Sequence, residues 1–205
     1  MVSIKLCNIT KDFGERGVLR NIEAEIHTGS CLVVIGRNGS GKSTLLKIIA
    51  GLLRPSSGKV VVEMDGKELG VGERRNVIGL VAPDLSLYDE LTALENVIFF
   101  TKVRGIMRRG SELMELLARV GLAGREHEQL AAYSSGMKQR MKYAFALLHD
   151  PPILMLDEPT ANLDSAGIAF VDQTIREYKQ SGLLVLATND QKEAEYGDQV
   201  IDLGV

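Results

Sequence analysis

The sequence contains no tryptophan, five prolines and only two cysteines among its 205 residues. Cys7 and Cys31 lie in apolar, strand-like stretches, which favours buried reduced thiols over a disulfide framework or a metal cluster. No apolar run approaches the roughly 20 residues that a membrane-spanning helix needs, and no charged-then-apolar leader opens the chain. We therefore expect a cytoplasmic protein that reaches a membrane only by docking on a partner.

The chain also lacks a strong charge of either sign. Its formal net charge of −3 gives no electrostatic attraction toward nucleic acid or an anionic membrane, so we expect no nucleic-acid partner. Hydrophobic residues at 45% and charged residues at 25% are ordinary values for a globular protein. The length favours a single domain over residues 1–205.

Buried strands alternate with helices along much of the chain. Apolar runs at 31–36, 153–157 and 183–188 are typical of strands that are buried on both faces, as in a parallel sheet. A helical pattern at 42–52 follows the first run, and another at 165–181 separates the second run from the third. This alternation predicts an α/β fold built on a mostly parallel sheet.

Two other parts of the sequence differ from this alternation. Residues 2–10 alternate like a strand of an antiparallel sheet, and helical periodicity dominates 85–149. One of the expected helices covers 111–122, with Ser111 as its N-cap. We therefore predict a core formed by residues 1–84 and 150–205, an antiparallel β subdomain at its N-terminal end, and a helical subdomain at 85–149.

The segment "GRNGSGKST", Gly36 to Thr44, follows one predicted strand and opens a helix, which is the setting of a phosphate-binding loop. Backbone N–H groups of such a loop wrap phosphates, its lysine lies between the outer phosphates, and its serine hydroxyl ligates Mg²⁺. A glycine-rich turn that merely includes a lysine is the alternative. The residues expected to contact nucleotide are Gly36, Asn38, Gly39, Ser40, Gly41, Lys42, Ser43 and Thr44.

The segment "ILMLDEPTANLD", Ile153 to Asp164, supplies two carboxylates at the end of a predicted strand. Asp157 is placed to hold Mg²⁺ together with Ser43, and Glu158 is placed to act as the general base on an attacking water. The alternative is that both carboxylates cap the next helix. With the phosphate-binding loop, they indicate a Mg²⁺-dependent nucleoside triphosphatase with the P-loop NTPase fold and its RecA-like sheet.

With these motifs in order, nearly the whole chain resembles the ATP-binding subunit of ATP-binding cassette (ABC) transporters. "YSSGMKQR", Tyr133 to Arg140, is similar to the LSGGQ signature of that family in an S-x-G-M-x-Q-R variant. The resemblance implies that Ser134, Ser135 and Gly136 contact the γ-phosphate of ATP bound to the opposite subunit. It also implies that Phe13 stacks on adenine, whereas a core or turn role is the alternative for this aromatic residue.

The resemblance further implies partners. A second ATP-binding subunit, identical or related, would close head-to-tail on two ATP molecules, with Ala161–Asp164 at the dimer contact. Residues 85–100 would receive an integral membrane subunit, so that the chain lies at the inner face of the cell membrane. Leu87 and Tyr88 in that region are equally well explained as core residues.

Two positions depart from the pattern of the family. Pro83 or Asp84 stands where the family has a glutamine, and Asp84 is a candidate Mg²⁺ ligand. Asn189 stands where the family has a switch histidine. Its amide can contact phosphate and accept a hydrogen bond, but it carries no charge. We expect Lys42, Glu158 and Asn189 to serve catalysis, with ATP binding preserved and turnover slow.

The leading functional hypothesis is therefore a Mg²⁺-dependent ATPase that powers an ABC transporter, and the signature variant favours an exporter. A narrower resemblance is to the haem-exporter subunit of cytochrome c biogenesis. From a different class, a nucleotide-controlled switch with little hydrolysis is the main alternative. A soluble cassette ATPase of DNA repair or translation is disfavoured, because such proteins generally carry coiled-coil insertions or tandem cassettes.

Overall fold

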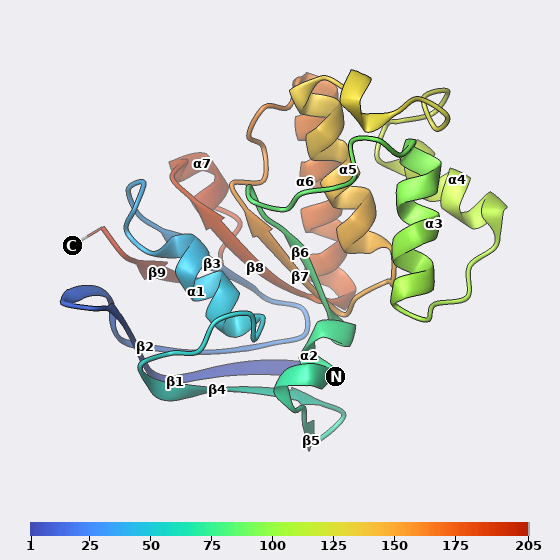
Figure 1. Ribbon diagram of the computed structural model, residues 1–205. Helices are drawn as coiled ribbons and strands as arrows, with labels where there is room; N and C mark the ends of the chain where they lie inside the picture. The colour runs from blue at the N-terminus through green and yellow to red at the C-terminus, as the bar shows by residue number, and fades with distance from the viewer. Residues whose placement is uncertain (205) are drawn as a thin grey trace.

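The computed structural model describes residues 1–204. An antiparallel sheet lies at the N-terminal end of the chain (Figure 1). Alternate residues of its first strand, such as Ile4 and Leu6, are buried, as expected for a sheet with one face on the core. In spatial order its strands are β2 (Arg16–His27), β1 (Val2–Phe13), β4 (Ser57–Met64) and β5 (Lys67–Glu68).

A second sheet is entirely parallel, which confirms the predicted α/β fold. All residues of two of its inner strands, β7 (Ile153–Asp157) and β8 (Leu183–Thr188), are buried, which explains their uninterrupted apolar sequences. In spatial order its strands are β6 (Ile78–Val81), β7 (Ile153–Asp157), β8 (Leu183–Thr188), β3 (Cys31–Ile35) and β9 (Gln199–Asp202).

The parallel sheet separates two hydrophobic cores, because successive side chains of a strand point to opposite faces. Leu32 and Val34 of β3 pack into the core shared with helix α1 (Lys42–Ile49) and the antiparallel sheet. Cys31 and Val33 face the other core, which is built mainly from the helices that follow residue 92. Each fully buried Leu or Val contributes about 1.5–3 kcal/mol, so both faces stabilise the sheet.

The predicted helical region forms three helices, α3 (Ala93–Val103), α4 (Gly110–Arg119) and α5 (Ser135–Leu147), preceded by a short 3-10 turn at Leu130–Ala132. Helices α6 (Ser165–Ser181) and α7 (Gln191–Ala194) flank β8 in sequence. Figure 1 shows α3, α4, α5 and α6 grouped on one side of the parallel sheet. None of the helices within residues 1–204 has the length and hydropathy required to span a bilayer.

One local prediction was wrong, and one short helix was not predicted. Helix α4 begins at Gly110, so Ser111 lies within it rather than capping it, and the Arg109 backbone N–H donates instead to Glu112 (2.9 Å). The sequence did not predict helix α2 (Val71–Val77), which is a single short element with Arg74 as its buried residue. Neither departure affects the placement of the candidate site.

Parallel pairing brings three functional segments to one edge of the sheet. Asp157 at the end of β7 pairs with Ala187, and Thr188 at the end of β8 pairs with Ile35 at the end of β3. The loop that begins at Gly36, the residue Glu158 and the residue Asn189 therefore all start from neighbouring strand ends. This is the edge at which open α/β sheets bind ligands.

Candidate active site

A cavity of about 500 Å³ opens at this edge, between the phosphate-binding loop and the tip of the β1–β2 hairpin. It contains most of the residues that the sequence assigns to nucleotide contact in this chain, together with Glu158. The lining residues are Phe13, Arg16, Val18, Asn38, Gly39, Gly41, Lys42, Ser43, Thr44 and Glu158. Gly36 and Ser40 belong to the same loop but do not line the cavity.

The loop reaches helix α1 through Gly41, whose φ of +109° is accessible mainly to glycine. A Cβ at this position would lie 2.7 Å from Cγ1 of Val18, so the loop also needs glycine in order to approach the antiparallel sheet. Lys42 begins α1 and is 5% exposed. Its ammonium donates to the carbonyl oxygens of Gly36 (2.8 Å) and Arg37 (3.4 Å). These hydrogen bonds from the loop compensate for the burial of the charge.

Glu158 lies opposite this ammonium, with its Oε1 atom 3.2 Å from Nζ of Lys42. Its backbone adopts φ +50°, an uncommon conformation for a residue other than glycine. The Glu158 N–H donates to the carbonyl of Ala187 (2.8 Å), so the turn out of β7 is attached to the end of β8. The carboxylate is thereby presented to the phosphate-binding loop.

Asp157 is nearly fully buried, and its Oδ1 atom has no hydrogen-bond partner among the described residues. Burial raises its pKa, the Ser43 hydroxyl opposes that rise, and Glu158 and Asp84 add to it. A buried carboxylate oxygen without a partner, beside a hydroxyl, fits a Mg²⁺ site in which phosphate and water supply the other ligands. Residues 1–204 hold no cluster of three or more His, Cys, Asp or Glu side chains suited to a metal ion.

Asp84 does not line the cavity that holds Lys42, although its charge acts on Asp157. Its carboxylate pairs with Lys47 (2.6 Å), which lowers its pKa, and it lines a different groove from the cavity that holds Lys42. A role as a Mg²⁺ ligand remains a prediction and would require Asp84 to leave Lys47. Burial lowers the pKa of the nearby Lys142, and the negative charge of Asp84 only partly opposes this effect.

Asn189 follows β8 directly and is exposed. Its side-chain N–H donates to Oδ1 of Asn38 in the phosphate-binding loop (3.3 Å). The Asn189 amide is therefore attached to the loop that would surround the phosphates. Helix α7 begins two residues later, with Asp190 as its N-cap.

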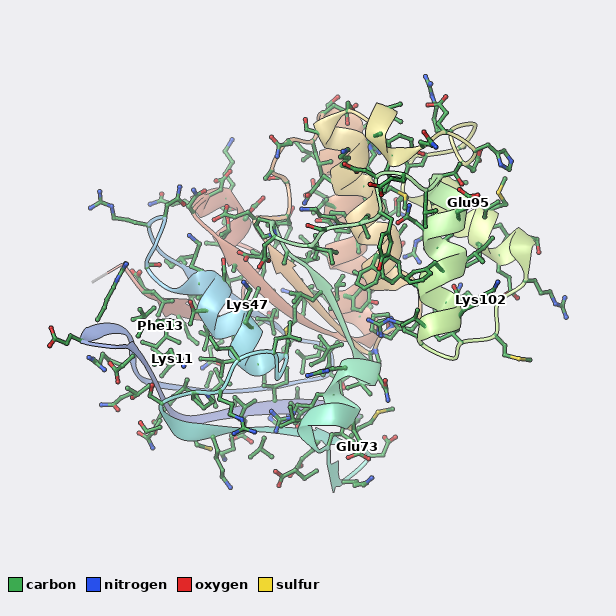
Figure 2. The ribbon with its side chains drawn as sticks, in the orientation of Figure 1. Lys11, Phe13, Lys47, Glu73, Glu95 and Lys102 are labelled. Atoms are coloured by element: carbon green, nitrogen blue, oxygen red, sulfur yellow. The ribbon has the colours of Figure 1, made fainter. Side chains whose placement is uncertain are left out.

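Phe13 is half exposed at the end of β1, and the Lys11 ammonium lies 4.9 Å from the centre of its ring (Figure 2). The exposed ring borders the cavity, as a base-stacking residue requires, and does not contribute to the core. The sequence did not predict the neighbouring Arg16, which lines the same cavity and contacts the Gly39 carbonyl at 3.5 Å. Its position three residues after Phe13, between two segments that alternate like strands, was the available signal.

The signature residues lie at the start of α5. Ser134 caps that helix by accepting from the Met137 N–H (3.2 Å), and Ser135 lines a separate hollow beside Lys138. A Cβ at Gly136 would approach the Asn162 carbonyl oxygen to 2.9 Å, so glycine lets the first turn of α5 lie close to the loop that contains Asn162. Within one chain, none of the three predicted signature residues lines the cavity that holds Lys42.

Comparisons with known proteins agree with this geometry. The model of the family described as ABC transporter matches residues 19–161. The lantibiotic transport ATP-binding protein SrtF of Streptococcus pyogenes is 34% identical over 186 residues, which cover 91% of this chain and 79% of that protein. HrtA of Staphylococcus haemolyticus, described as a hemin import ATP-binding protein, is 35% identical over 214 residues, which cover 98% of this chain and 97% of that protein.

A solved structure gives the same result for the fold. The dimeric post-hydrolysis state of the ATP-binding cassette MJ0796, bound to ADP and Pi, superposes with a TM-score of 0.83 at 32% identity, covering 98% of this chain and 94% of that one. The parallel sheet, the antiparallel β subdomain and the helices on the sheet are those of an ABC ATPase cassette. The chain therefore belongs to the ABC transporter family, in which it is one of the ATP-binding proteins.

Proposed function

We propose that this chain hydrolyses ATP to power an ABC transporter. The observation that carries the proposal is the 3.2 Å approach of Glu158 to Lys42 at one wall of the loop-lined cavity. A carboxylate and a buried ammonium then face the same small space, one suited to a water molecule and the other to a phosphate. A module that only bound nucleotide would need the ammonium but not the carboxylate.

The chemistry follows from these positions. An attacking water forms a bond to the γ-phosphorus while the bond from that phosphorus to the β–γ bridging oxygen breaks, which yields ADP and inorganic phosphate. Glu158 orients the water and takes up its proton. Lys42 and the loop N–H groups stabilise the negative charge on the phosphoryl oxygens, and the N-terminus of α1 adds its dipole. Asn189, which is hydrogen-bonded to Asn38 of the loop, offers a neutral donor.

We propose that Ser43 and Asp157 hold Mg²⁺ in this reaction. The support is the unpartnered Oδ1 of the buried Asp157 and the neighbouring Ser43 hydroxyl. When bound, the ion would neutralise charge on the phosphate oxygens. Asp84, paired with Lys47, is left out of this pair of ligands.

The absence of the signature residues Ser134–Gly136 from the lining of the cavity supports a dimeric active unit. Because Ser134–Gly136 do not line the cavity of their own chain, they are available to the phosphate on a second chain arranged head-to-tail. ATP then favours the closed dimer, and loss of the γ-phosphate removes the contacts from Ser134 and Gly136. The dimeric relative bound to ADP and Pi supports this arrangement.

A groove of about 340 Å³ is the proposed seat of the membrane subunit. It is mainly apolar, with Leu52 more than half exposed at its edge. Only Leu85 of the predicted 85–100 region lines it, while Tyr88 and Phe99 in that region pack edge-on with ring centres 5.0 Å apart. The groove residues are Lys47, Ala50, Leu52, Arg75, Ile78, Leu80, Ala82, Asp84, Leu85, Arg104 and Phe145.

We further propose export as the direction of transport, on the resemblance of "YSSGMKQR" to export-type signatures. The relatives reported above are described for lantibiotic transport and for hemin import, so their names alone leave the direction open. Transport of a labelled substrate by inverted vesicles that carry the assembled transporter decides it. Uptake into inverted vesicles supports export, and uptake into right-side-out vesicles contradicts it.

The decisive experiment for hydrolysis compares the purified chain with its Glu158→Gln variant, in steady-state Mg²⁺–ATP turnover over a range of protein concentrations. Turnover that rises more than linearly with concentration and is lost in the variant supports a dimeric ATPase with Glu158 as base. Tight ATP binding with no turnover above that of the variant contradicts autonomous hydrolysis. That result supports the nucleotide-controlled switch, which the neutral Asn189 favours.

A further inference from the structure

The three residues from Glu158 to Thr160 are each anchored by a different element. The Glu158 N–H donates to the Ala187 carbonyl of β8 at 2.8 Å. The Pro159 carbonyl accepts from the hydroxyl of Tyr143 on α5 at 2.9 Å. The Thr160 hydroxyl donates to Oε1 of Glu193 on α7 at 2.5 Å.

These anchors hold a backbone that is not at its preferred geometry. Glu158 has φ +50°, and a residue with a Cβ remains in that region only when its surroundings fix it, at a cost of about 1–3 kcal/mol. The preceding residue, Asp157, is fixed within the sheet. The position of the Glu158 carboxylate therefore depends on what holds the two residues after it.

Tyr143 and Glu193 are both buried, although each carries a polar group. Tyr143 is fully buried in the helical core and packs edge-on against Phe170, with ring centres 5.3 Å apart. Burial raises the pKa of Tyr143 well above its usual range, so its hydroxyl keeps its proton and donates a hydrogen bond to the Pro159 carbonyl. Glu193 is 6% exposed, and Thr160 is the side chain that donates to its carboxylate.

The two anchors also belong to elements that begin at other parts of the site. Helix α5 has Ser134 as its N-cap, and α7 has Asp190, the neighbour of Asn189, as its N-cap. The contacts of Tyr143 and Glu193 thus connect the turn at Glu158 with the helix of the signature and with the helix that follows Asn189. A shift of either helix would be transmitted to Pro159 or Thr160.

We propose that Tyr143 and Glu193 are positioning residues for Glu158, acting through the Pro159 carbonyl and the Thr160 hydroxyl. This inference rests on the proposed hydrolysis with Glu158 as base. Neither residue contacts the cavity that holds Lys42. Their effect is on the geometry of the water-activating carboxylate, where displacement of a reacting group by about 1 Å can lower the rate by up to two orders of magnitude.

The test uses substitutions that remove one hydroxyl each. Tyr143→Phe keeps the ring in the core, and Thr160→Val keeps the shape of the side chain. We expect each to lower kcat about tenfold while KM and the Kd for ATP change less than about twofold, since the phosphate-binding loop is untouched. Thr160→Ser retains a hydroxyl and should restore most of the lost kcat.

The chain offers a matched control in Tyr178. Its hydroxyl donates to the carbonyl of Pro151 (3.0 Å), just before β7, whereas that of Tyr143 donates to a proline carbonyl just after β7. Tyr178→Phe removes the same kind of hydrogen bond at the opposite end of the strand. A general loss of stability would affect Tm in both variants, and only a positioning role would lower kcat in Tyr143→Phe alone.

The outcomes separate this inference from the proposed function. A fall of kcat in Tyr143→Phe and Thr160→Val, with no further fall when either is added to Glu158→Gln, supports the positioning role. Loss of turnover in Glu158→Gln with unchanged kcat in both hydroxyl variants overturns the inference and leaves the proposed function intact. Full turnover in Glu158→Gln overturns both.

Discussion

The Nζ atom of Lys42 lies 3.2 Å from Oε1 of Glu158, and the lysine is the more buried partner, with 6% of its side chain exposed against 26% for the glutamate. The two residues come from α1 and from the end of β7, which are more than 100 positions apart in the sequence. Their proximity nevertheless gives them different tasks. The ammonium is suited to a phosphate group, whereas the carboxylate is suited to a water molecule.

This relationship predicts that binding and turnover can be separated. Lys42→Ala should weaken ATP binding about 10- to 100-fold, because a charge-assisted hydrogen bond contributes about 1.5–3 kcal/mol. Glu158→Gln should keep ATP affinity within about threefold of the wild type while turnover is lost. Equilibrium titration with a fluorescent ATP analogue measures the affinity of each variant, and steady-state hydrolysis measures its turnover. The control is Lys59→Ala, because Lys59 is an exposed lysine on β4. Equal loss of affinity in Lys42→Ala and Glu158→Gln would contradict the division of tasks.

We predict that replacing Asn189 by histidine increases the rate of ATP hydrolysis. Its neutral amide donates to Asn38, where the family has a histidine that can carry charge. Asn189→His should raise kcat about five- to tenfold, the difference between a charge-assisted and a neutral hydrogen bond in the transition state. Asn189→Ala should lower it.

Single-turnover kinetics of both Asn189 variants, with ATP bound at saturation, measure this effect apart from affinity. The rate of the histidine variant should also acquire a pH dependence near the ordinary imidazole pKa of about 6.5. A histidine variant as slow as the alanine variant would show that the site has been rebuilt around the amide.

The lowered pKa of the partly buried His149 leads to a prediction of how the stability of the folded chain depends on pH. Burial, and then the charge of Arg104, lower its pKa from 6.5 to about 4, while its Nε2 atom lies 3.2 Å from the Ile78 carbonyl oxygen. The unfolded chain therefore binds this proton between pH 6.5 and 4 when the folded chain does not. Stability must fall as pH falls through that window.

We expect His149 to account for a loss of about 1–2 kcal/mol of unfolding free energy between pH 7 and pH 4.5, after allowance for solvent screening. Urea unfolding of the wild type and of His149→Gln at both pH values measures it. The variant should lose less stability on acidification than the wild type. His127→Gln, an exposed histidine, is the control, and parallel loss in all three proteins would contradict the assignment.

The sequence was informative where a local pattern determines the structure. The uninterrupted apolar residues of Leu183–Thr188 required a strand buried on both faces, and the glycine spacing from Gly36 to Gly41 required a phosphate-binding loop. Contacts between distant segments were not accessible in this way. The position of Arg16 beside Gly39, the pairing of Asp84 with Lys47 and the bond from Tyr143 to Pro159 all depend on how the elements pack.

The boundaries of short elements were also not determined by local pattern. Helix α2 has too few buried residues to produce a periodic signal. At the start of α4, Glu112 accepts from the Arg109 backbone N–H, so the N-cap is Arg109, two residues before the predicted cap Ser111. Cap preferences favour a residue type but do not exclude a neighbouring start.

The apolar groove predicts a variant that fails to assemble. Leu52 is 54% exposed and borders a groove whose cations include Arg75 and Arg104. A membrane subunit would fill the groove with an apolar side chain and present a carboxylate to the arginines. Leu52→Glu places a charge where the apolar contact is expected. It should lower the yield of the complex with the co-expressed membrane subunit by about tenfold or more.

Copurification of the two subunits at matched expression measures this effect. The control is Val200→Glu, a similar change on β9, where the valine is 48% exposed and does not line the groove. Both substitutions lie at partly exposed positions, so both should leave Tm within about 2 °C of the wild type. Loss of the complex in Leu52→Glu alone identifies the groove as the docking surface. Equal yields in the two variants would place the membrane subunit on another face of the cassette.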